Sequence, residues 1–386
     1  MRFNAAMFSR ITSSTRYLPI IDGLRFMAIA PVVLYHINQF YGFNGPLSNS
    51  ARTDPLFHLL NLGNFGVRLF FVISGFILSL PFAEHYLRGA KQVSLKQYFI
   101  RRLTRLEPPY IISLLIYFGV RWLAQGSLHA SSISDLFLSL FYSTFAFHKL
   151  STINYVTWSL EIEVQFYIFA PLLCTLFAVK SKIFRRFILA GTVLILGAFK
   201  TFVFNQPLWC LLDFLHYFVV GLLLCDLYLV SWEKTSRRPL VWDVVGLCSW
   251  ALLVADLVCD FWVPMITPVL IFTAYCSAMR GRLWNKLLTI PLLVTIGGMC
   301  YTIYLYHVLL LAAPATATFA CIRVGSAYWL NVIVQCIILC PLVFACSAIL
   351  FAALERPFMV PNWPQLFCQQ ITAKTLLWRR KKDVIS

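Results

Sequence analysis

This chain of 386 residues has few charged side chains, and few acidic ones in particular. Charged residues make up 12% of it and hydrophobic residues 60%, whereas a soluble domain averages about 25% charged residues. Fifteen acids stand against 32 Lys and Arg. This composition excludes an ordinary soluble domain and indicates a polytopic membrane protein. The aromatic content of 16% suits interfacial belts and packed helices.

Other absences narrow the function. The twelve cysteines form no C-x-x-C pair and no Cys/His cluster with zinc spacing, so we expect neither a disulfide framework nor a metal site. The chain shows no internal repeat, no low-complexity segment and no soluble domain. A net charge of +17 would suggest nucleic acid in a soluble chain, but here the basic residues lie in short loops between apolar runs. We therefore expect no nucleic acid partner.

Long apolar runs predict the fold class, an all-α membrane helix bundle with about ten transmembrane helices. The run over 136–147 is too short to span and is typical of an outer interfacial or re-entrant helix. Residues 1–17 carry no apolar region with a cleavage site, so the first helix is expected to be retained. The membrane domain is predicted over 18–357, between a tail over 1–17 and a basic tail over 358–386. The predicted spans are 18–40, 59–81, 108–124, 158–179, 187–204, 208–230, 241–259, 261–279, 290–315 and 328–352.

The distribution of Lys and Arg predicts the orientation. One set of alternate loops and both tails hold 25 of the 32 basic residues, and the opposite loops hold three. Because cytoplasmic loops are enriched in Lys and Arg, both termini are predicted to be cytoplasmic. The basic end of the chain would then be an anchor near anionic lipid.

The first helix, over Tyr17–Gln39, carries two polar residues that suggest chemistry inside the membrane. Arg25 and His36 are eleven residues apart, which is about 16 Å along a helix and almost a whole number of turns, so they share a face. An Arg at the bilayer centre costs about 2.5–3.5 kcal/mol on insertion scales, and His suits proton transfer near neutral pH. In the alternative interpretation, Arg25 reaches lipid phosphates and His36 only hydrogen-bonds at the other interface.

The basic loop after the second predicted helix holds a second pair of cations. Ser94 and Gln97 have capping-box spacing and open an amphipathic interfacial helix, after which Pro108 begins the third membrane helix. Arg102 and Arg105 are three residues apart and can point the same way, which suits a phosphate-rich ligand. Ordinary positive-inside anchoring also explains such a loop.

Two further helices add polar candidates. On the second helix, Ser74 offers a small surface for close packing, and Arg68 is an intramembrane cation that needs a partner. Ser159 and Glu163 are four residues apart on the fourth helix. Glu163 is the candidate counter-charge for Arg68 or hydrogen-bond partner for His36, although a structural ion pair fits equally well.

Two more candidates complete the set. Asp22 can pair with Arg25 or cap its helix. In the predicted orientation His307, on the ninth predicted helix, lies about a third to half way across the membrane, and a lone His on an apolar helix is more often a packing residue than a ligand.

Six segments resemble, in order, the acyltransferase-3 family of integral membrane O-acyltransferases. They cover roughly residues 17–357 and read IDGLRFMAIAPVVLYH, GVRLFFVISGFIL, YFIRRLTRLEPPY, WSLEIEVQFY, IGGMCYTIYLYH and LERP. The resemblance implies ten membrane helices, an acyl-coenzyme A donor on the cytoplasmic side and a hydroxyl acceptor on a carbohydrate or similar molecule. No permanently bound cofactor is implied, and we expect no counterpart of the hydrolase-like domain that some family members carry.

The family's motifs fall on particular residues. Arg25 and His36 match its Arg-x10-His motif, Arg102 and Arg105 match its Arg-x-x-Arg motif, and Glu163 matches the acid of its WSL-x-x-E pattern. The late-helix histidine of the family is matched by His307. Two departures are Arg68, where many members have Asp or another residue, and Val164, where many have a second Glu.

The predicted function is a multi-pass O-acyltransferase of a bacterial cytoplasmic membrane. It would move an acyl group, with acetyl favoured, from acyl-coenzyme A to an exopolysaccharide, a lipopolysaccharide or an oligosaccharide. Arg25, Arg102 and Arg105 would hold the coenzyme, His36 would be the general base, and Glu163 would orient it. Direct transfer and an acyl-enzyme both stay open. A transporter or flippase of a glycan or anionic metabolite is the alternative, because intramembrane Arg, Glu and His also mark translocation pathways.

Overall fold

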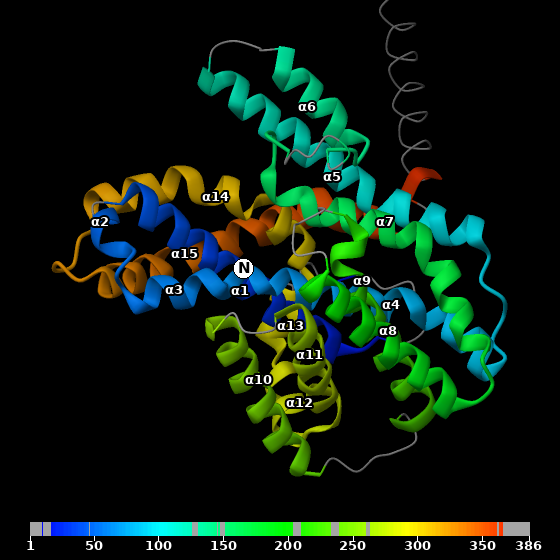
Figure 1. Ribbon diagram of the computed structural model, residues 1–386. Helices are drawn as coiled ribbons and strands as arrows, with labels where there is room; N and C mark the ends of the chain where they lie inside the picture. Colours follow the sequence, from blue (N-terminus) through cyan, green and yellow to red (C-terminus); the bar gives the residue numbers. More distant parts are fainter. Residues whose placement is uncertain are drawn as a thin grey trace, which may run out of the picture.

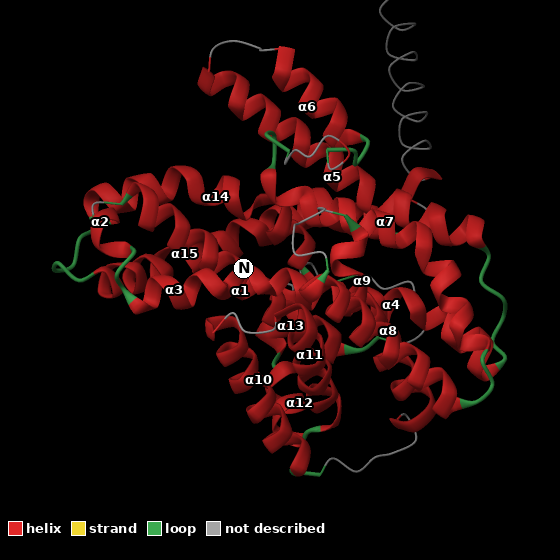
Figure 2. Cartoon of the chain, viewed as in Figure 1, coloured by secondary structure: helices red, strands yellow, loops and turns green. Residues whose placement is uncertain are grey.

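The structure is a computed structural model, and it describes residues 10, 17–45, 47–125, 130–144, 146, 151–203, 210–232, 239–259, 263–360 and 363–365. Over these ranges the chain is helical and contains no strand, as Figures 1 and 2 show. The all-α prediction is therefore confirmed. Most of the predicted basic tail lies outside the described residues, as does nearly all of the N-terminal tail.

The helices follow one another with short connections. In the first half of the chain they are α1 (Pro19–Asn44), α2 (Ser48–Ala51), α3 (Pro55–Asn61), α4 (Gly66–Arg88), α5 (Leu95–Gln125), α6 (Ala130–Leu140) and α7 (Trp158–Leu173), with the 3-10 turn η4 (Tyr155–Thr157) leading into α7. In the second half they are α8 (Lys182–Phe202), α9 (Leu211–Leu227), α10 (Val241–Cys259), α11 (Val263–Arg280), α12 (Arg282–Leu288), α13 (Pro291–Gly298), α14 (Cys300–Cys321) and α15 (Tyr328–Leu350).

Seven helical segments among the described residues are long and apolar enough to cross a membrane, namely Pro19–Asn44, Pro55–Arg88, Tyr155–Ala178, Leu211–Trp232, Val241–Cys259, Cys300–Cys321 and Tyr328–Met359. The other predicted spans fall on the helices α5, α8 and α11. The count of ten spans and the orientation of the termini stay predictions.

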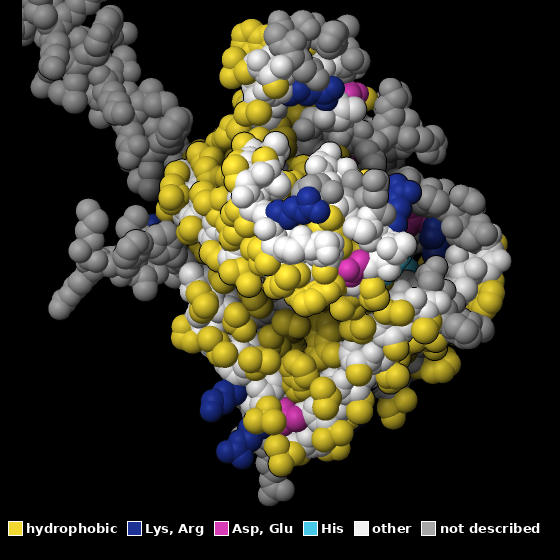
Figure 3. All heavy atoms as spheres, turned by 90° about the vertical axis from the view of Figure 1, so that its left-hand side faces the viewer, with side chains coloured by type: hydrophobic (Ala, Val, Ile, Leu, Met, Phe, Trp, Pro, Cys, Tyr) yellow, Lys and Arg dark blue, Asp and Glu magenta, His cyan; other side chains and the backbone are white. Residues whose placement is uncertain are grey.

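Much of the surface is apolar, as a protein that faces lipid requires. On the face shown in Figure 3, hydrophobic side chains form broad continuous areas, and the charged side chains occur in a few separate places. Large apolar residues such as Leu123, Ile183 and Ile195 are 70% or more exposed. In a soluble protein such a surface would cause aggregation, so the structure agrees with the membrane prediction from composition.

The prediction of two separate helices around Pro108 is wrong, because α5 runs without a break from Leu95 to Gln125. Proline lacks the N–H that would bond to the carbonyl four residues earlier, which here belongs to Thr104. That carbonyl instead accepts a hydrogen bond of 2.8 Å from the indole N–H of Trp363. The start of α5 was predicted correctly, since the hydroxyl of Ser94 accepts from the N–H of Gln97 at 3.4 Å.

The predicted span over 290–315 is divided into α13 and α14, with Met299 between them. The division lies two residues after a close contact between α13 and α1. A Cβ on Gly297 would lie 1.7 Å from the carbonyl oxygen of Asp22, so only glycine permits this approach. The new helix begins at Cys300, and the backbone N–H of Thr302 in its first turn donates to the carboxylate of Glu355, which follows α15 in the chain.

Helix α1 lies at the centre of the bundle, where it contacts α3, α4, α13, α14 and α15. The helices α4 and α9 form another close pair. A Cβ on Gly75 would lie 2.2 Å from the carbonyl oxygen of Phe218, so the small surface beside Ser74 does receive another helix, as its sequence predicts.

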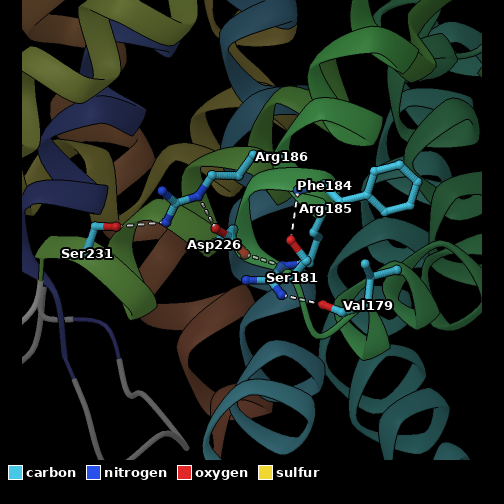
Figure 4. A network of polar contacts seen from close by, with 7 residues as sticks. All are labelled: Val179, Ser181, Phe184, Arg185, Arg186, Asp226 and Ser231. Carbon is cyan, nitrogen blue, oxygen red and sulfur yellow. Dashed lines mark hydrogen bonds and ion pairs between the residues drawn. The ribbon is translucent and has the colours of Figure 1, made fainter.

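An ion-pair network fixes α8 against α9, as Figure 4 shows. The carboxylate of Asp226 is fully buried and accepts from the guanidinium groups of Arg185 and Arg186, the latter at 2.6 Å. Arg186 also donates to the hydroxyl of Ser231 at 2.7 Å. Both arginines precede the predicted span over 187–204, whereas Asp226 lies within the predicted span over 208–230.

Candidate active site

Four arginines converge on one cavity between α1, α4, α5, α7 and α14. The centres of water molecules can occupy about 130 Å³ of it. Its polar lining consists of Arg10, Arg25, Arg102, Arg105, Ser74, Ser159, Glu163, Tyr167, Tyr301, Tyr304 and Glu355. The structure therefore brings together the three arginines that were predicted to hold the coenzyme. Ser74, Ser159 and Glu163 also lie on this wall.

Asp22 holds two of these arginines in place. Its Oδ1 accepts from Nη1 of Arg25 at 2.5 Å and lies 3.3 Å from Nη1 of Arg10. The pairing with Arg25 is the one predicted for residues three apart on a helix. Arg10 was placed in a cytoplasmic tail by sequence, and no motif marked it. One buried carboxylate thus orders two guanidinium groups at the cavity wall.

Arg102 and Arg105 lie on the part of α5 that precedes its apolar half. The guanidinium carbon of Arg102 lies 5.5 Å from the ring centroid of Tyr98 and 6.0 Å from that of Tyr167, so the ring faces attract its charge. Burial, with repulsion from Arg10 and Arg102, lowers the pKa of Arg105 to about 9. Arg105 still carries its positive charge at neutral pH.

Glu355 lines the cavity and was not among the predicted site residues. Its Oε2 accepts from the backbone N–H of Thr302 at 3.1 Å and from the hydroxyl of the same residue. This N–H belongs to the first turn of α14, where intrahelical partners are missing. The only signal in the sequence was the closing LERP motif, which contains this residue.

Glu163 does not contact the partners that were predicted for it. Its Oε1 accepts from the hydroxyl of Ser74 at 2.5 Å, and Tyr167 and Arg102 are the other groups that interact with it. The prediction that Glu163 pairs with Arg68 or with His36 is therefore wrong. The reason is the packing of α4 on α7, which brings Ser74 rather than a charged residue to the carboxylate.

Arg68 lies elsewhere, close to His216 of α9. Within the described ranges it forms no ion pair. It does not line the arginine cavity.

His36 and His307 contact each other, with ring centroids 4.9 Å apart. Nδ1 of His36 lies 3.1 Å from the hydroxyl of Tyr155. Nδ1 of His307 lies 2.9 Å from the carbonyl oxygens of Ile303 and Tyr304. Since carbonyl oxygens only accept, this nitrogen carries the hydrogen, and Nε2 of a neutral His307 has a lone pair. That Nε2 is buried and has no partner among the described residues.

Neither histidine lines the arginine cavity. Tyr155, Ser159, Glu163 and Tyr167 succeed one another at steps of four residues, so they follow one stripe of the helix and rise about 6 Å per step. The stripe contacts His36 at Tyr155 and the arginine cavity at the other three residues. The histidine pair therefore meets this stripe at Tyr155, the position next to those that line the cavity.

Comparison with known sequences decides the family. The sequence profile of the acyltransferase-3 family, described as an acyltransferase domain, matches residues 18–352. The chain belongs to the acyltransferase-3 family. The resemblance seen in the six motifs is thereby confirmed, and so is the prediction of an acyltransferase, at the level of the family. With its apolar helices, this family member is an integral, multi-pass membrane protein.

Similar curated proteins come from Staphylococcus aureus. The chain is 24% identical over 325 residues to the O-acetyltransferase OatA of strain NCTC 8325. It is 26% identical over 323 residues to SACOL0978 of strain COL, whose name gives O-acetyltransferase as a provisional activity. Each match covers 76% of this chain and 50% of the relative, so the chain spans about half the length of these relatives. No solved structure matches the chain.

Proposed function

We propose that this member of the acyltransferase-3 family transfers an acetyl group from acyl-coenzyme A to a hydroxyl of a carbohydrate acceptor. The observation that carries the proposal is the cavity with four arginines, together with a pair of buried histidines that contacts the same helix stripe at Tyr155. The first feature suits a phosphate-bearing donor and the second suits proton transfer. The O-acetyltransferase names of the Staphylococcus relatives support the acetyl group.

The donor would bind by its phosphates at the arginine end of the cavity. Arg25, Arg102 and Arg105 supply guanidinium forks, and Arg10 adds a fourth. Such forks form two parallel hydrogen bonds to a phosphate. The thin pantetheine arm would then lie along the cavity, past Ser74 and Glu163, and carry the thioester toward His36. With the orientation predicted from the basic loops, the donor would bind from the cytoplasmic side of a bacterial cytoplasmic membrane.

His36 would act as the general base. With its Nδ1–H donated to the oxygen of Tyr155, its Nε2 accepts the proton of the acceptor hydroxyl. The hydroxyl oxygen attacks the thioester carbonyl carbon, the carbon–sulfur bond breaks, and the coenzyme thiolate leaves and takes up the proton from His36. Tyr155 and His307, which both contact the ring, hold it in place. Glu163 would instead bind Ser74 on the wall along which the arm lies.

Thiol release from acetyl-coenzyme A tests this proposal. Purified protein in nanodiscs is supplied with acetyl-coenzyme A, with and without a bacterial polysaccharide, and His36→Gln is compared with wild type. We expect a rate lower by about 10²–10⁴-fold in the variant, with unchanged coenzyme binding. His216→Gln is the matched control, because His216 is also buried within a membrane helix but does not line the cavity.

A wild-type protein that neither binds acyl-coenzyme A nor releases thiol would refute the proposal. A transporter or flippase would then explain the intramembrane charges better. Full activity of His36→Gln, by contrast, would leave acyl transfer in place and remove only the assignment of the base.

A further inference from the structure

The four arginines of the cavity form two pairs that are held in different ways. In the first pair, Arg10 and Arg25 both interact with Oδ1 of Asp22 on α1. Arg10 also lies beside α13, where a Cβ on Gly298 would be 3.8 Å from the Cβ of Arg10. We call Arg10 and Arg25 the Asp22 pair.

Arg102 and Arg105, which we call the α5 pair, lie on another helix. The guanidinium carbon of Arg102 is 6.0 Å from the ring centroid of Tyr167 on α7. Arg102 also interacts with Glu163, which is one turn earlier on the same helix. The proposed path of the pantetheine arm runs past Glu163. The α5 pair is therefore beside the proposed path of the arm.

Each pair has a hydrogen-bond donor that no protein group uses. Nε of Arg10 and Nε of Arg102 are buried and have no hydrogen-bond partner among the described residues. Arg105 interacts electrostatically with both of these arginines, and like charges repel one another. Buried N–H groups without partners are costly. An anionic group at each pair would satisfy both donors and relieve the repulsion.

Coenzyme A carries phosphate at two separate places. Its pyrophosphate is bonded directly to the pantetheine arm, and a phosphate monoester stands on the 3′ position of the ribose, beyond the pyrophosphate. A phosphate monoester carries about −1.5 to −2 charges at pH 7, and a guanidinium fork can give it two parallel hydrogen bonds. The two phosphate positions of the coenzyme thus match the two arginine pairs in number.

We infer that the Asp22 pair, through Arg10, binds the 3′-phosphate of the coenzyme, and that the α5 pair binds the pyrophosphate. This inference rests on the proposed function. Because the proposed path of the arm lies beside the α5 pair, the pyrophosphate that is bonded to the arm is placed there. The 3′-phosphate is further from the thioester and is left for the Asp22 pair. Arg10 is then a specificity-determining residue that selects coenzyme A over donors without a 3′-phosphate.

The test measures the binding of coenzyme A and of 3′-dephospho-coenzyme A to the whole chain in nanodiscs by isothermal titration calorimetry, so no acceptor is needed. We expect wild type to bind coenzyme A about 10- to 100-fold more tightly, which is the effect of hydrogen bonds to a charged group. Arg10→Gln should lower the affinity for coenzyme A to that for the dephospho form and leave the latter unchanged. Asp22 keeps Arg25 as its partner in this variant.

Two further variants serve as controls. Arg102→Gln should weaken the binding of both ligands by a similar factor, because both contain the pyrophosphate. Arg101→Gln removes a charge from the neighbouring position of α5, which is exposed and does not line the cavity. Both affinities of Arg101→Gln should therefore stay those of wild type at the same salt concentration.

Three results would overturn the inference. Equal affinities of wild type for the two ligands would do so without any variant, so the test does not depend on the folding of Arg10→Gln. An equal loss for both ligands in Arg10→Gln would show that Arg10 does not bind the 3′-phosphate, and so would a loss of preference in Arg102→Gln alone. In all three cases the binding of coenzyme A by wild type leaves the proposed function standing. If wild type binds neither ligand, the proposed function fails and the inference fails with it.

Discussion

Replacing Gly297 by alanine tests the closest helix contact beside the arginine cavity. A Cβ at this position would lie 1.7 Å from the carbonyl oxygen of Asp22, 2.7 Å from its carbonyl carbon and 2.9 Å from the backbone nitrogen of Phe26. All three are backbone atoms, so no side-chain rotation relieves the overlap. Since ordinary contacts begin near 3.4 Å, α13 and α1 would have to separate locally by about 1.7 Å.

The expected cost follows from that overlap. Overpacking of a well-packed interior costs about 1–3 kcal/mol and occasionally more. Alanine is favoured over glycine in a helix by about 1 kcal/mol, and this gain offsets only part of the cost of overpacking. We therefore expect Gly297→Ala to lower the free energy of unfolding by about 1–3 kcal/mol. It should also weaken donor binding, because the displaced residue is Asp22, whose carboxylate orders Arg25.

The loss of stability is measured by heating the detergent-purified protein and using size-exclusion chromatography to monitor its thermal unfolding. The neighbouring Gly298→Ala is the matched control, because its Cβ would meet only the Cβ of Arg10, at 3.8 Å. The control should unfold at the wild-type temperature or slightly above it. If Gly297→Ala and Gly298→Ala unfold at the same temperature, the close approach of α13 to α1 is wrong.

Two further predictions concern buried carboxylates. Asp226→Ala leaves Arg185 buried without its counter-charge, so we expect a loss of about 3–5 kcal/mol in the free energy of unfolding. Arg186→Ala, on the more exposed partner, should cost much less, and similar losses in thermal unfolding for both variants would contradict this reasoning. Glu355→Gln keeps an acceptor for Thr302 and removes one negative charge from the cavity, so coenzyme titration should show tighter binding with unchanged stability. Glu355→Ala should also lose about 1–3 kcal/mol of stability, because a buried N–H is left unpaired. Weaker binding by Glu355→Gln would show that this carboxylate does not oppose the donor.

The elements of the bundle were predictable because their causes are local. Apolar runs of membrane length give helices whatever surrounds them. Ser94 caps a helix through the N–H of Gln97, three residues later. Asp22 forms an ion pair with Arg25, also three residues later. The predicted helix boundaries were wrong where groups distant in the sequence contact the helix. Trp363 supplies a donor to the carbonyl of Thr104, which Pro108 leaves without its helical partner, and a close contact with the backbone of α1 accompanies the division of the ninth predicted span.

The sequence by itself determined the membrane class, the family and the residue types at the site, since these depend on composition and on ordered motifs. The tertiary structure alone decided which of these residues meet. Ser74 and Glu163 are 89 residues apart, and His36 and Tyr155 are 119 apart. No periodicity relates one helix face to another across such distances. Close helix packing around small residues such as Gly297 determines which helix faces are in contact. As a result, the arginines line the cavity and the histidines do not.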